Sequence, residues 1–438
     1  MRVSQPAELP TRLIGQAAVG QAVRLRSCEF GSRRKAKQHS GVDAGTVIAM
    51  PMGYLATTVL IAWCTFFAVV APRRPQLLAS MSFWFGLIIN EVPFVGIYFL
   101  VGSTALAAGQ GDLDSTGAKV LVAVSVAATL GLAVSAWRGV RSDQAVGQAL
   151  EDGLGTGWRD RVQTPMRRNR PWARILLLPG FMRRRDVQRI RNISYGDAGR
   201  RNLLDIYRHR DAPRNAPVLI YFHGGHYTSG GKSREARPLL SHLAAQGWLC
   251  ISANYRLRPE TTFPGHQIDA KKVIAWVREH GSEYGADPSR LFVAGSSAGS
   301  NMAGLCALTP NDPVFQPGFE SADTSVTAAV CLYGFYGHYF GTPPDEPPPA
   351  PQPQGYIHPG APPFFIAHGT KDALGTVEGA RNFAAQLRRA SSSTVVYAEL
   401  PGAQHAFDIF HSPRFEAVVD GIDAFAAWVL ATPRQTAA

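Results

Sequence analysis

A serine inside a Gly-Ser-Ser-Ala-Gly pentapeptide, residues 295–299, is the first feature of the sequence that could do chemistry. By itself the G-x-S-x-G pattern is weak, because a chain with 43 glycines can contain one by chance. Here, however, an apolar β-rich run at 291–294 precedes it and a helix-like run at 298–308 follows it. Between a strand and a helix, small flanking residues permit a tight turn that presents the serine hydroxyl above a sheet. Ser297 is therefore the candidate nucleophile.

A general base and an acid that orients it are the partners that a serine hydroxyl needs. Asp372 follows the apolar run 364–368, and His405 follows the next β-rich run, 394–400. In a parallel sheet the loops after these runs emerge at the same edge as the turn at Ser297. Serine, then aspartate, then histidine is also the chain order expected of such a hydrolase. We predict that Ser297, Asp372 and His405 form a catalytic triad.

Glycines after a further strand-like run indicate where an oxyanion would be bound. The segment His223-Gly224-Gly225-His226 follows the run that ends at Phe222. Glycines at a strand end let backbone N–H groups turn toward a shared point. We predict that Gly224, Gly225 and His226, together with Ala298, line the oxyanion hole. His223 is interpreted as a residue that holds the loop in shape and not as the base.

Other histidines and aspartates compete with these assignments. His411 is the main alternative to His405 as the base. Asp408 lies too close to His405 in sequence to orient the imidazole from behind, and Asp269 comes too early in the chain for the triad. His368, at the end of a strand-like run, is expected to anchor a loop or the core.

Short β-rich runs alternate with helix-like segments from about residue 189, which predicts a mainly parallel sheet covered by helices on both faces. The first two strands are expected to form an antiparallel hairpin at one edge. The proline-dense stretch 342–363 is predicted to be a loop. The predicted strands are 190–195, 203–207, 218–222, 248–255, 291–295, 328–333, 364–368 and 394–400, and the predicted helices lie near 234–246, 266–280, 298–308, 376–390 and 415–431.

These segments resemble the α/β-hydrolase superfamily and, within it, the hormone-sensitive-lipase-like carboxylesterases and lipases of actinobacteria. The resemblance covers roughly 190–432 and implies the same triad, with the oxyanion amides at Gly225, His226 and Ala298. It implies no metal or organic cofactor. The matching segments are Tyr221 to Gly225, Asn254-Tyr255-Arg256-Leu257-Arg258-Pro259-Glu260, Gly295 to Gly299, His368-Gly369-Thr370-Lys371-Asp372 and Gly402-Ala403-Gln404-His405-Ala406-Phe407.

Two positions depart from the pattern of that family. His226 stands where the family often has a third glycine, which places a side chain beside the acyl pocket. Ser296 stands where an acidic residue usually precedes the nucleophile. Neither change removes a catalytic group, but both leave the acyl-chain preference open.

Three uncharged runs in the N-terminal half predict membrane segments near 48–71, 83–108 and 119–137, because about 20 apolar residues cross a bilayer. The chain has a net charge of +12, and its basic character belongs to this half, whose arginine clusters flank the apolar runs. Anionic lipid headgroups are the expected partner, and no nucleic-acid motif accompanies the clusters. A solvated basic linker and, for the third run, a buried soluble helix remain the alternatives.

The expected organisation is a basic N-terminal tail over 1–44, a membrane region over 45–137, a basic linker over 138–188 and a catalytic domain over 189–432. Glu91 lies either inside the second apolar run or at the membrane surface. The charge rule gives opposite topologies with and without residues 1–49.

The predicted function is that of a multi-pass, membrane-anchored serine carboxylesterase or lipase that cleaves small-molecule or lipid esters through an acyl-enzyme. An amidase or peptidase on the same fold, and a non-catalytic membrane receptor or scaffold, are the alternatives. The oligomeric state stays open.

Overall fold

A computed structural model describes residues 51–162, 170–212, 214–336 and 351–432. They belong to the unit formed by residues 48–438. The predicted N-terminal tail, 1–44, lies outside the described residues.

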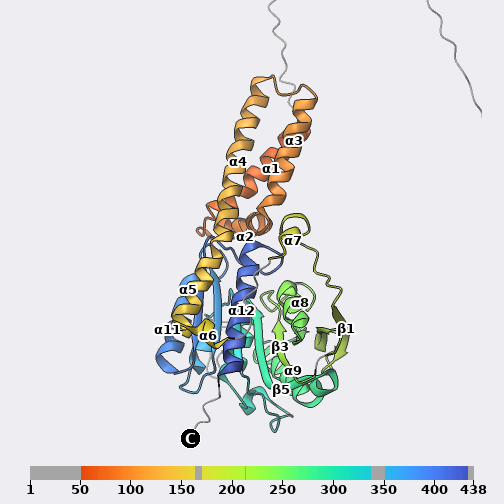
Figure 1. The fold of residues 1–438 in the computed structure, drawn as a ribbon, viewed down its shortest axis with the longest axis vertical. Coiled ribbons are helices and arrows are strands. Elements are labelled where there is room, and N and C mark those ends of the chain that lie inside the picture. The colour runs from red at the N-terminus through yellow and green to blue at the C-terminus, as the bar shows by residue number, and fades with distance from the viewer. Residues whose placement is uncertain (1–50, 163–169, 213, 337–350, 433–438) are drawn as a thin grey trace, which may run out of the picture. The chain divides into compact units, whose positions relative to one another are not determined.

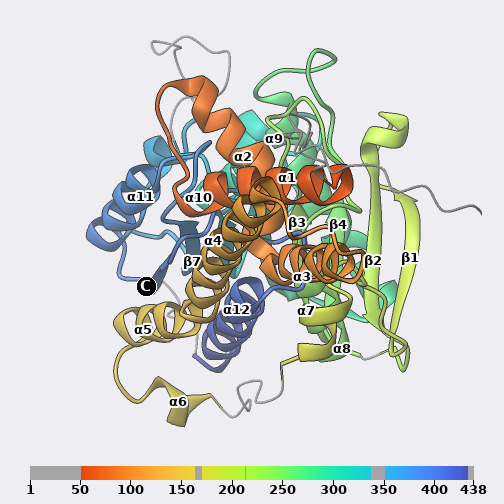
Figure 2. The same cartoon turned by 90° about the horizontal axis from the view of Figure 1, so that it is seen from above.

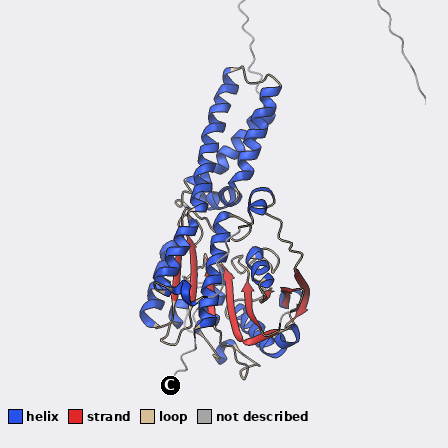
Figure 3. Ribbon diagram, viewed as in Figure 1, coloured by secondary structure: helices blue, strands red, loops and turns tan. Residues whose placement is uncertain are grey.

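One eight-stranded sheet, of order β1-β2-β4-β3-β5-β6-β7-β8, carries the catalytic part of the chain. The six strands from β4 to β8 in this order run parallel, whereas β2 is antiparallel to both of its neighbours. The sheet lies among the helices in Figure 3. The strands are β1 (Val187–Ser194), β2 (Leu203–His209), β3 (Ala216–Phe222), β4 (Leu249–Ala253), β5 (Ala286–Ser296), β6 (Ala328–Leu332), β7 (Phe364–Gly369) and β8 (Val395–Leu400).

Two apolar layers bury the sheet, because successive strand residues point to opposite faces. Leu219 and Tyr221 of β3 pack into the layer under α5 (Ser142–Leu154), α8 (Arg237–Ala245) and α12 (Pro413–Ala431). Val218 and Ile220 pack into the layer under α9 (Gly265–His280), α10 (Ala298–Leu308) and α11 (Val377–Ala390).

The predicted strands and helices of this part are each found within a few residues of their expected bounds, including the antiparallel β1–β2 hairpin. The described part of the proline-dense stretch contains one short 3₁₀ helix, Pro353–Tyr356. The topology is that of the α/β-hydrolase fold.

The N-terminal part contains α1 (Met52–Val69), α2 (Gln76–Glu91), α3 (Pro93–Gly109) and α4 (Thr116–Val140). Ile61, Leu100 and Leu132 join α1, α3 and α4 in one apolar cluster, and these three helices run side by side in Figure 1. Two helices of the described chain, α1 and the helix beginning at Thr116, are long and apolar enough to cross a membrane.

The predicted apolar segment 83–108 is not one continuous helix. It is broken at Val92, and α2 and α3 are bent by 82° relative to each other. Pro93 explains the break, because proline lacks an N–H and disfavours helical geometry in the residue before it. Figure 2 shows α2 and α3 pointing in different directions.

The prediction of a linker over 138–188 is wrong for its first part. The helix that begins at Thr116 continues through α5, and Val146, Ala149 and Leu150 of α5 are buried in the core against the sheet. Gly153 lies so close to Val396 of β8 that a Cβ would meet its side chain at 2.8 Å. The catalytic domain therefore includes α5.

Glu91 joins α2 to the catalytic domain. Its carboxylate forms an ion pair with Arg414 and accepts a hydrogen bond from the Ser412 hydroxyl at 2.9 Å. The neighbouring Asn90 donates from Nδ2 to the carbonyl of Gly402 at 3.1 Å. The charges of Glu91 and Arg414 are both buried, so the removal of either one would leave the other buried without its partner.

We expect Glu91→Ala to lower the free energy of unfolding by about 3–5 kcal/mol, because it leaves the Arg414 charge buried without its partner. The side chains of Glu91 and Arg414 are each 1% exposed. Arg159 and Glu151 also form an ion pair, but their side chains are 52% and 40% exposed. Glu151→Ala should therefore cost less than about 1 kcal/mol. Thermal unfolding of both variants in one detergent tests this, and equal losses would contradict it.

Candidate active site

Ser297 stands at a strained turn between β5 and α10. Its backbone φ of 54° and ψ of −117° are unusual for a residue with a side chain. The two glycines of the pentapeptide permit this turn. A Cβ at Gly295 would lie 2.0 Å from the carbonyl oxygen of Gly299, and one at Gly299 would lie 2.0 Å from that of Phe222. The strand-turn-helix expected from the sequence is therefore present, and its small residues are required sterically.

The three predicted triad residues meet at the carboxyl edge of the sheet. Nε2 of His405 lies 2.9 Å from Oγ of Ser297, and Nδ1 of His405 lies 2.8 Å from Oδ2 of Asp372. These distances suit a hydroxyl, an imidazole and a carboxylate joined in series by hydrogen bonds.

Asp372 is held as an ionised, oriented carboxylate. The backbone N–H groups of Leu374 and Gly375 donate to its Oδ1 at 2.9 and 2.8 Å. Burial would raise the pKa of Asp372, but the charge of His405 and hydrogen bonds from His368 and His405 outweigh it and hold the pKa below its ordinary value. A fixed negative charge behind the imidazole favours the protonated ring that would form during nucleophilic attack.

The loop after β3 follows the prediction with one correction. Gly224 cannot offer its amide to an oxyanion, because its N–H donates to the buried carboxylate of Glu235 at 2.5 Å. Gly225 and His226 adopt φ values of 122° and 53°, which turn the backbone sharply at the serine. Gly225, His226 and Ala298 thus remain the candidate oxyanion residues.

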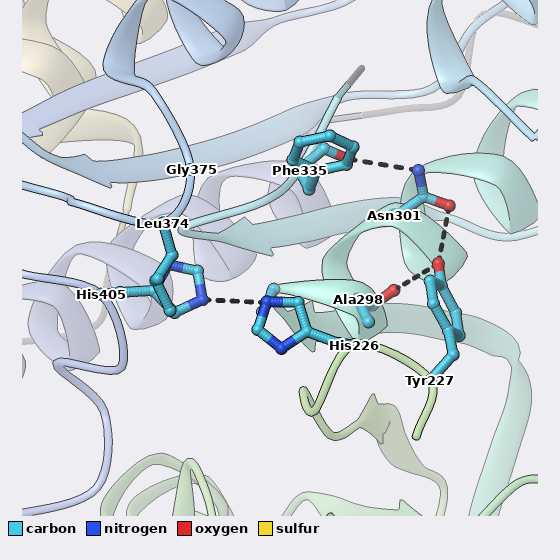
Figure 4. Close-up of a pocket in the computed structure, with 9 residues that line it drawn as sticks. His226, Tyr227, Ala298, Asn301, Phe335, Leu374, Gly375 and His405 are labelled. Carbon is cyan, nitrogen blue, oxygen red and sulfur yellow. Dashed lines mark hydrogen bonds between the residues drawn. The ribbon is translucent and has the colours of Figure 1, made fainter. Parts of the chain in front are cut away.

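A pocket opens beside Ser297. Figure 4 shows the rings of His226 and His405 on one side of it and Tyr227 with Asn301 on the other. The Tyr227 hydroxyl donates to Oδ1 of Asn301 at 3.0 Å. The remaining lining residues are Ala298, Phe335, Leu374 and Gly375, and most of the wall area that the nine residues expose is apolar.

The competing residues have other partners. Nδ1 of His411 lies 2.5 Å from the Glu416 carboxylate, and Asp269 forms an ion pair with Arg256. His368 is buried, with Nε2 at 3.0 Å from the carbonyl oxygen of Gly375 and 3.3 Å from Asp372, as expected of a loop anchor.

His223 fits the interpretation of a residue that shapes its loop. Its Nδ1 lies 2.6 Å from the carbonyl oxygen of Gly224, and its ring stacks on Tyr255 with centroids 4.4 Å apart. Burial lowers the pKa of His223 to about 4. Among the described residues, no group of three His, Cys, Asp or Glu side chains could hold a metal ion.

A buried acidic network behind the site was missed by the sequence reasoning. Asp408 accepts hydrogen bonds from Ser296 at 2.6 Å and from Tyr221 at 3.0 Å, and also from Tyr333. The network thus joins the residue before the nucleophile to the loop of His405. Ser296, at the position where the resemblance leads us to expect an acidic residue, donates to the Asp408 carboxylate, and the serine at 296 was the one available signal.

Glu235 is the second acid of this network and holds the amide of Gly224. Burial and the charge of Asp408 raise the pKa of Glu235 to about 7, and burial also raises the pKa of Asp408. Two buried carboxylates this close disfavour double ionisation, so the pair tends to retain a proton near neutral pH.

Comparison with known proteins shows the family of the chain. Residues 204–337 match the BD-FAE family model. The chain is 41% identical over 382 residues to the probable carboxylic ester hydrolase LipM of Mycobacterium tuberculosis, covering 81% of this chain and 88% of that protein. Esterase LipQ of the same organism is 42% identical over 318 residues, covering 66% and 76%, and esterase LipC is 34% identical over 346 residues, covering 74% and 81%.

A solved structure with a similar chain is the butyrate-bound esterase Est2 of Thermogutta terrifontis. It is 25% identical, covers 53% of this chain and 92% of its own, and superposes with a TM-score of 0.46.

Fold and site together define an α/β-hydrolase. With its mycobacterial relatives LipM, LipQ and LipC, the chain belongs to the hormone-sensitive-lipase-like family of carboxylic ester hydrolases.

Gly299→Ala should lower esterase kcat at least about 100-fold, because the added Cβ would displace the turn that carries Ser297. Gly304→Ala lies on the same helix, where a Cβ would meet its nearest atom at an ordinary 3.6 Å, and should change kcat less than about 2-fold. Full activity of the 299 variant would contradict the steric requirement. Circular dichroism of both variants distinguishes a local effect from unfolding.

Glu235→Gln should flatten the pH dependence of stability between about pH 4.5 and 7. The folded-state pKa of Glu235 lies above its ordinary value of 4.5, so its stabilising effect is complete below pH 4.5 and is lost as the pH rises through about 7. In this window, the free energy of unfolding of the wild type should therefore fall by up to about 1.4 kcal/mol more per pH unit than that of the variant.

Urea unfolding of both proteins from pH 4.5 to about 8 measures the difference. Glu279→Gln, at an exposed glutamate, should leave the wild-type slope unchanged. Identical slopes for the wild type and the 235 variant would show that Glu235 does not retain a proton in the folded state.

Proposed function

We propose that this carboxylic ester hydrolase acts by a serine mechanism in which Ser297 is the nucleophile, His405 the general base and Asp372 the residue that orients and charges the base. The observation that carries the proposal is the pair of distances across His405, 2.9 Å to the Ser297 hydroxyl and 2.8 Å to the Asp372 carboxylate. Bases at these distances can accept a proton as the hydroxyl attacks.

The reaction has two acyl-transfer steps. Ser297 Oγ attacks the ester carbonyl while His405 Nε2 takes its proton, and the amides of Gly225, His226 and Ala298 stabilise the oxyanion. His405 then protonates the leaving alcohol, which leaves an acyl group on Ser297. Water, deprotonated by His405, attacks the acyl-enzyme and releases the acid.

The same chain, we propose, is anchored in a membrane by its N-terminal helices. Support comes from the length and apolar character of α1 and α4, and from the bent pair α2–α3, which could form a broken span or a re-entrant loop. Large apolar side chains are exposed on the bundle, as a lipid environment would require, among them Leu60, Phe99 and Leu130.

Ser297→Ala should lower kcat on a nitrophenyl ester by about 10³-fold or more without unfolding the domain. Ser300→Ala, three residues along the same turn and helix, should retain activity, because its hydroxyl makes only a 3.5 Å contact with Tyr336. A fluorophosphonate probe followed by peptide mapping should label position 297 alone.

Undiminished hydrolysis by the 297 variant would refute the serine mechanism. Failure of the probe to label a folded wild-type protein would favour a non-catalytic receptor or scaffold. A matched ester and amide pair separates the esterase from the amidase alternative, and we expect faster cleavage of the ester.

A further inference from the structure

Helix α2 lies across the loops that carry the base and its acid. Before α2 begins, the carbonyl of Val70 accepts a hydrogen bond from Nζ of Lys371 at 3.2 Å, and Arg73 donates to the carbonyl of Thr370. Both partners are in the loop after β7 that contains Asp372. At its other end, α2 is fixed by Asn90 and Glu91, through the loop after β8 and the start of α12.

The middle of α2 reaches the catalytic histidine itself. The ring of Phe83 meets that of His405 edge to face, with centroids 6.0 Å apart. Phe83 belongs to the core layer of the catalytic domain, and Leu87, one turn later, packs against the same layer. The inner face of α2 is therefore part of the domain that holds the site.

The other face of α2 is apolar and uncovered. Leu77, Trp84 and Ile88 are 71%, 68% and 52% exposed. At spacings of seven and four residues they lie along one side of the helix. A helix that is apolar on both sides and exposed on one of them is unsuited to water.

The direction of α2 fits the surface of a bilayer. It is bent by 82° from α3, which packs along α1 and α4. If those helices cross a membrane, α2 must lie nearly parallel to its plane. Arg73 and Arg74 directly precede α2, and exposed Trp137 lies under the guanidinium of Arg141 near the end of α4. Arginine and tryptophan residues such as these, at the ends of membrane helices, are typical of the headgroup region of a bilayer.

A second apolar element flanks the same edge of the sheet. Helix α7 (Trp172–Leu177) and the residues after it expose Trp172, Leu177, Leu178 and Phe181. This segment is joined to the loop that follows His405, because the N–H of His411 donates to the carbonyl of Pro179 at 2.9 Å. The arginines of this segment and of the next residues, Arg174, Arg183, Arg184 and Arg185, line an adjoining cavity. Basic side chains beside exposed apolar ones complement an anionic lipid surface.

We propose that α2 is an interfacial helix and that the site takes its ester from the bilayer beside α2, so that the substrates are acyl esters that partition into membranes. This inference rests on the proposed serine esterase and its membrane anchor. The mainly apolar wall of the pocket suits an acyl chain. A bilayer, rather than a protein, is the occupant of the exposed face, because the neighbouring helices α1, α3 and α4 also expose large apolar side chains and because arginines stand just before α2.

The test uses the full chain reconstituted in vesicles of phosphatidylcholine and phosphatidylglycerol. Two substrates are compared, dioleoylglycerol dissolved in the bilayer and nitrophenyl acetate in the surrounding water. The variant Leu77→Gln/Ile88→Gln changes the exposed face of α2 and spares Trp84, whose ring contacts Phe83. The control, Val314→Gln, replaces an exposed apolar residue of the catalytic domain in the 3₁₀ helix Pro313–Phe315.

We expect the α2 variant to release oleate at least about 10-fold more slowly than the wild type, because polar side chains weaken the seating of α2 in the interface. Its rate on nitrophenyl acetate should stay within about 2-fold, and the 314 control should match the wild type on both substrates. Flotation of the variant with the vesicles verifies that α1, α3 and α4 still anchor it.

Equal effects on both substrates, or none on either, would overturn the proposal. So would a wild type that cleaves nitrophenyl acetate but ignores dioleoylglycerol, a result that leaves the esterase function intact. If the proposed serine mechanism itself were wrong, Ser297→Ala would retain activity on the soluble ester. That result distinguishes failure of the mechanism from failure of the present proposal.

Discussion

The parallel alignment of β3, β5, β7 and β8 is the constraint on which the site depends. Parallel strands deliver the loops at their carboxyl ends to one edge. The proposed oxyanion loop, nucleophile, acid and base come from four segments spread over about 180 residues of sequence, yet each needs only to follow its strand in order to reach the others. The burial of the sheet on both faces fixes this edge, because a strand that slipped by one residue would turn its apolar side chains the wrong way.

Local sequence patterns were sufficient to predict this part of the molecule. Apolar runs followed by glycine, aspartate or histidine located β3, β5, β7 and β8, and the distances at His405 agree with the predicted order of the triad. The Gly224 amide was misassigned, because its partner, Glu235, lies eleven residues away at the start of the predicted helix 234–246, and no local pattern links the two residues. The role of Asp408 was not foreseen, because its contact with Ser296 joins segments 112 residues apart. Such side-chain networks depend on tertiary packing that a single sequence does not encode locally.

The N-terminal half was harder to predict, because hydropathy shows how apolar a segment is and not the direction in which its helix runs. An uncharged run over 92–111 gives the same signal whether the chain before it continues straight or bends. Val92 and Pro93 mark the bend, but proline is also tolerated in membrane helices, so the residue alone does not decide. Glu91 had two open interpretations, in the bilayer or at its surface. Its buried partner Arg414 lies 323 residues later in the chain and could not be inferred from the run itself.

Continuity of α4 with α5 has a practical meaning for anyone who wishes to study the enzyme in water. A truncation placed where the sequence resemblance begins, near residue 190, would remove a helix whose Val146 and Leu150 fill the core beneath β8 and α12. A chain that keeps α5 in this layer starts no later than about Ser142, the first residue of α5, although Phe83 of α2 also belongs to the layer. If a shorter fragment is insoluble, the cause would then be the loss of the α5 layer and not a requirement for lipid.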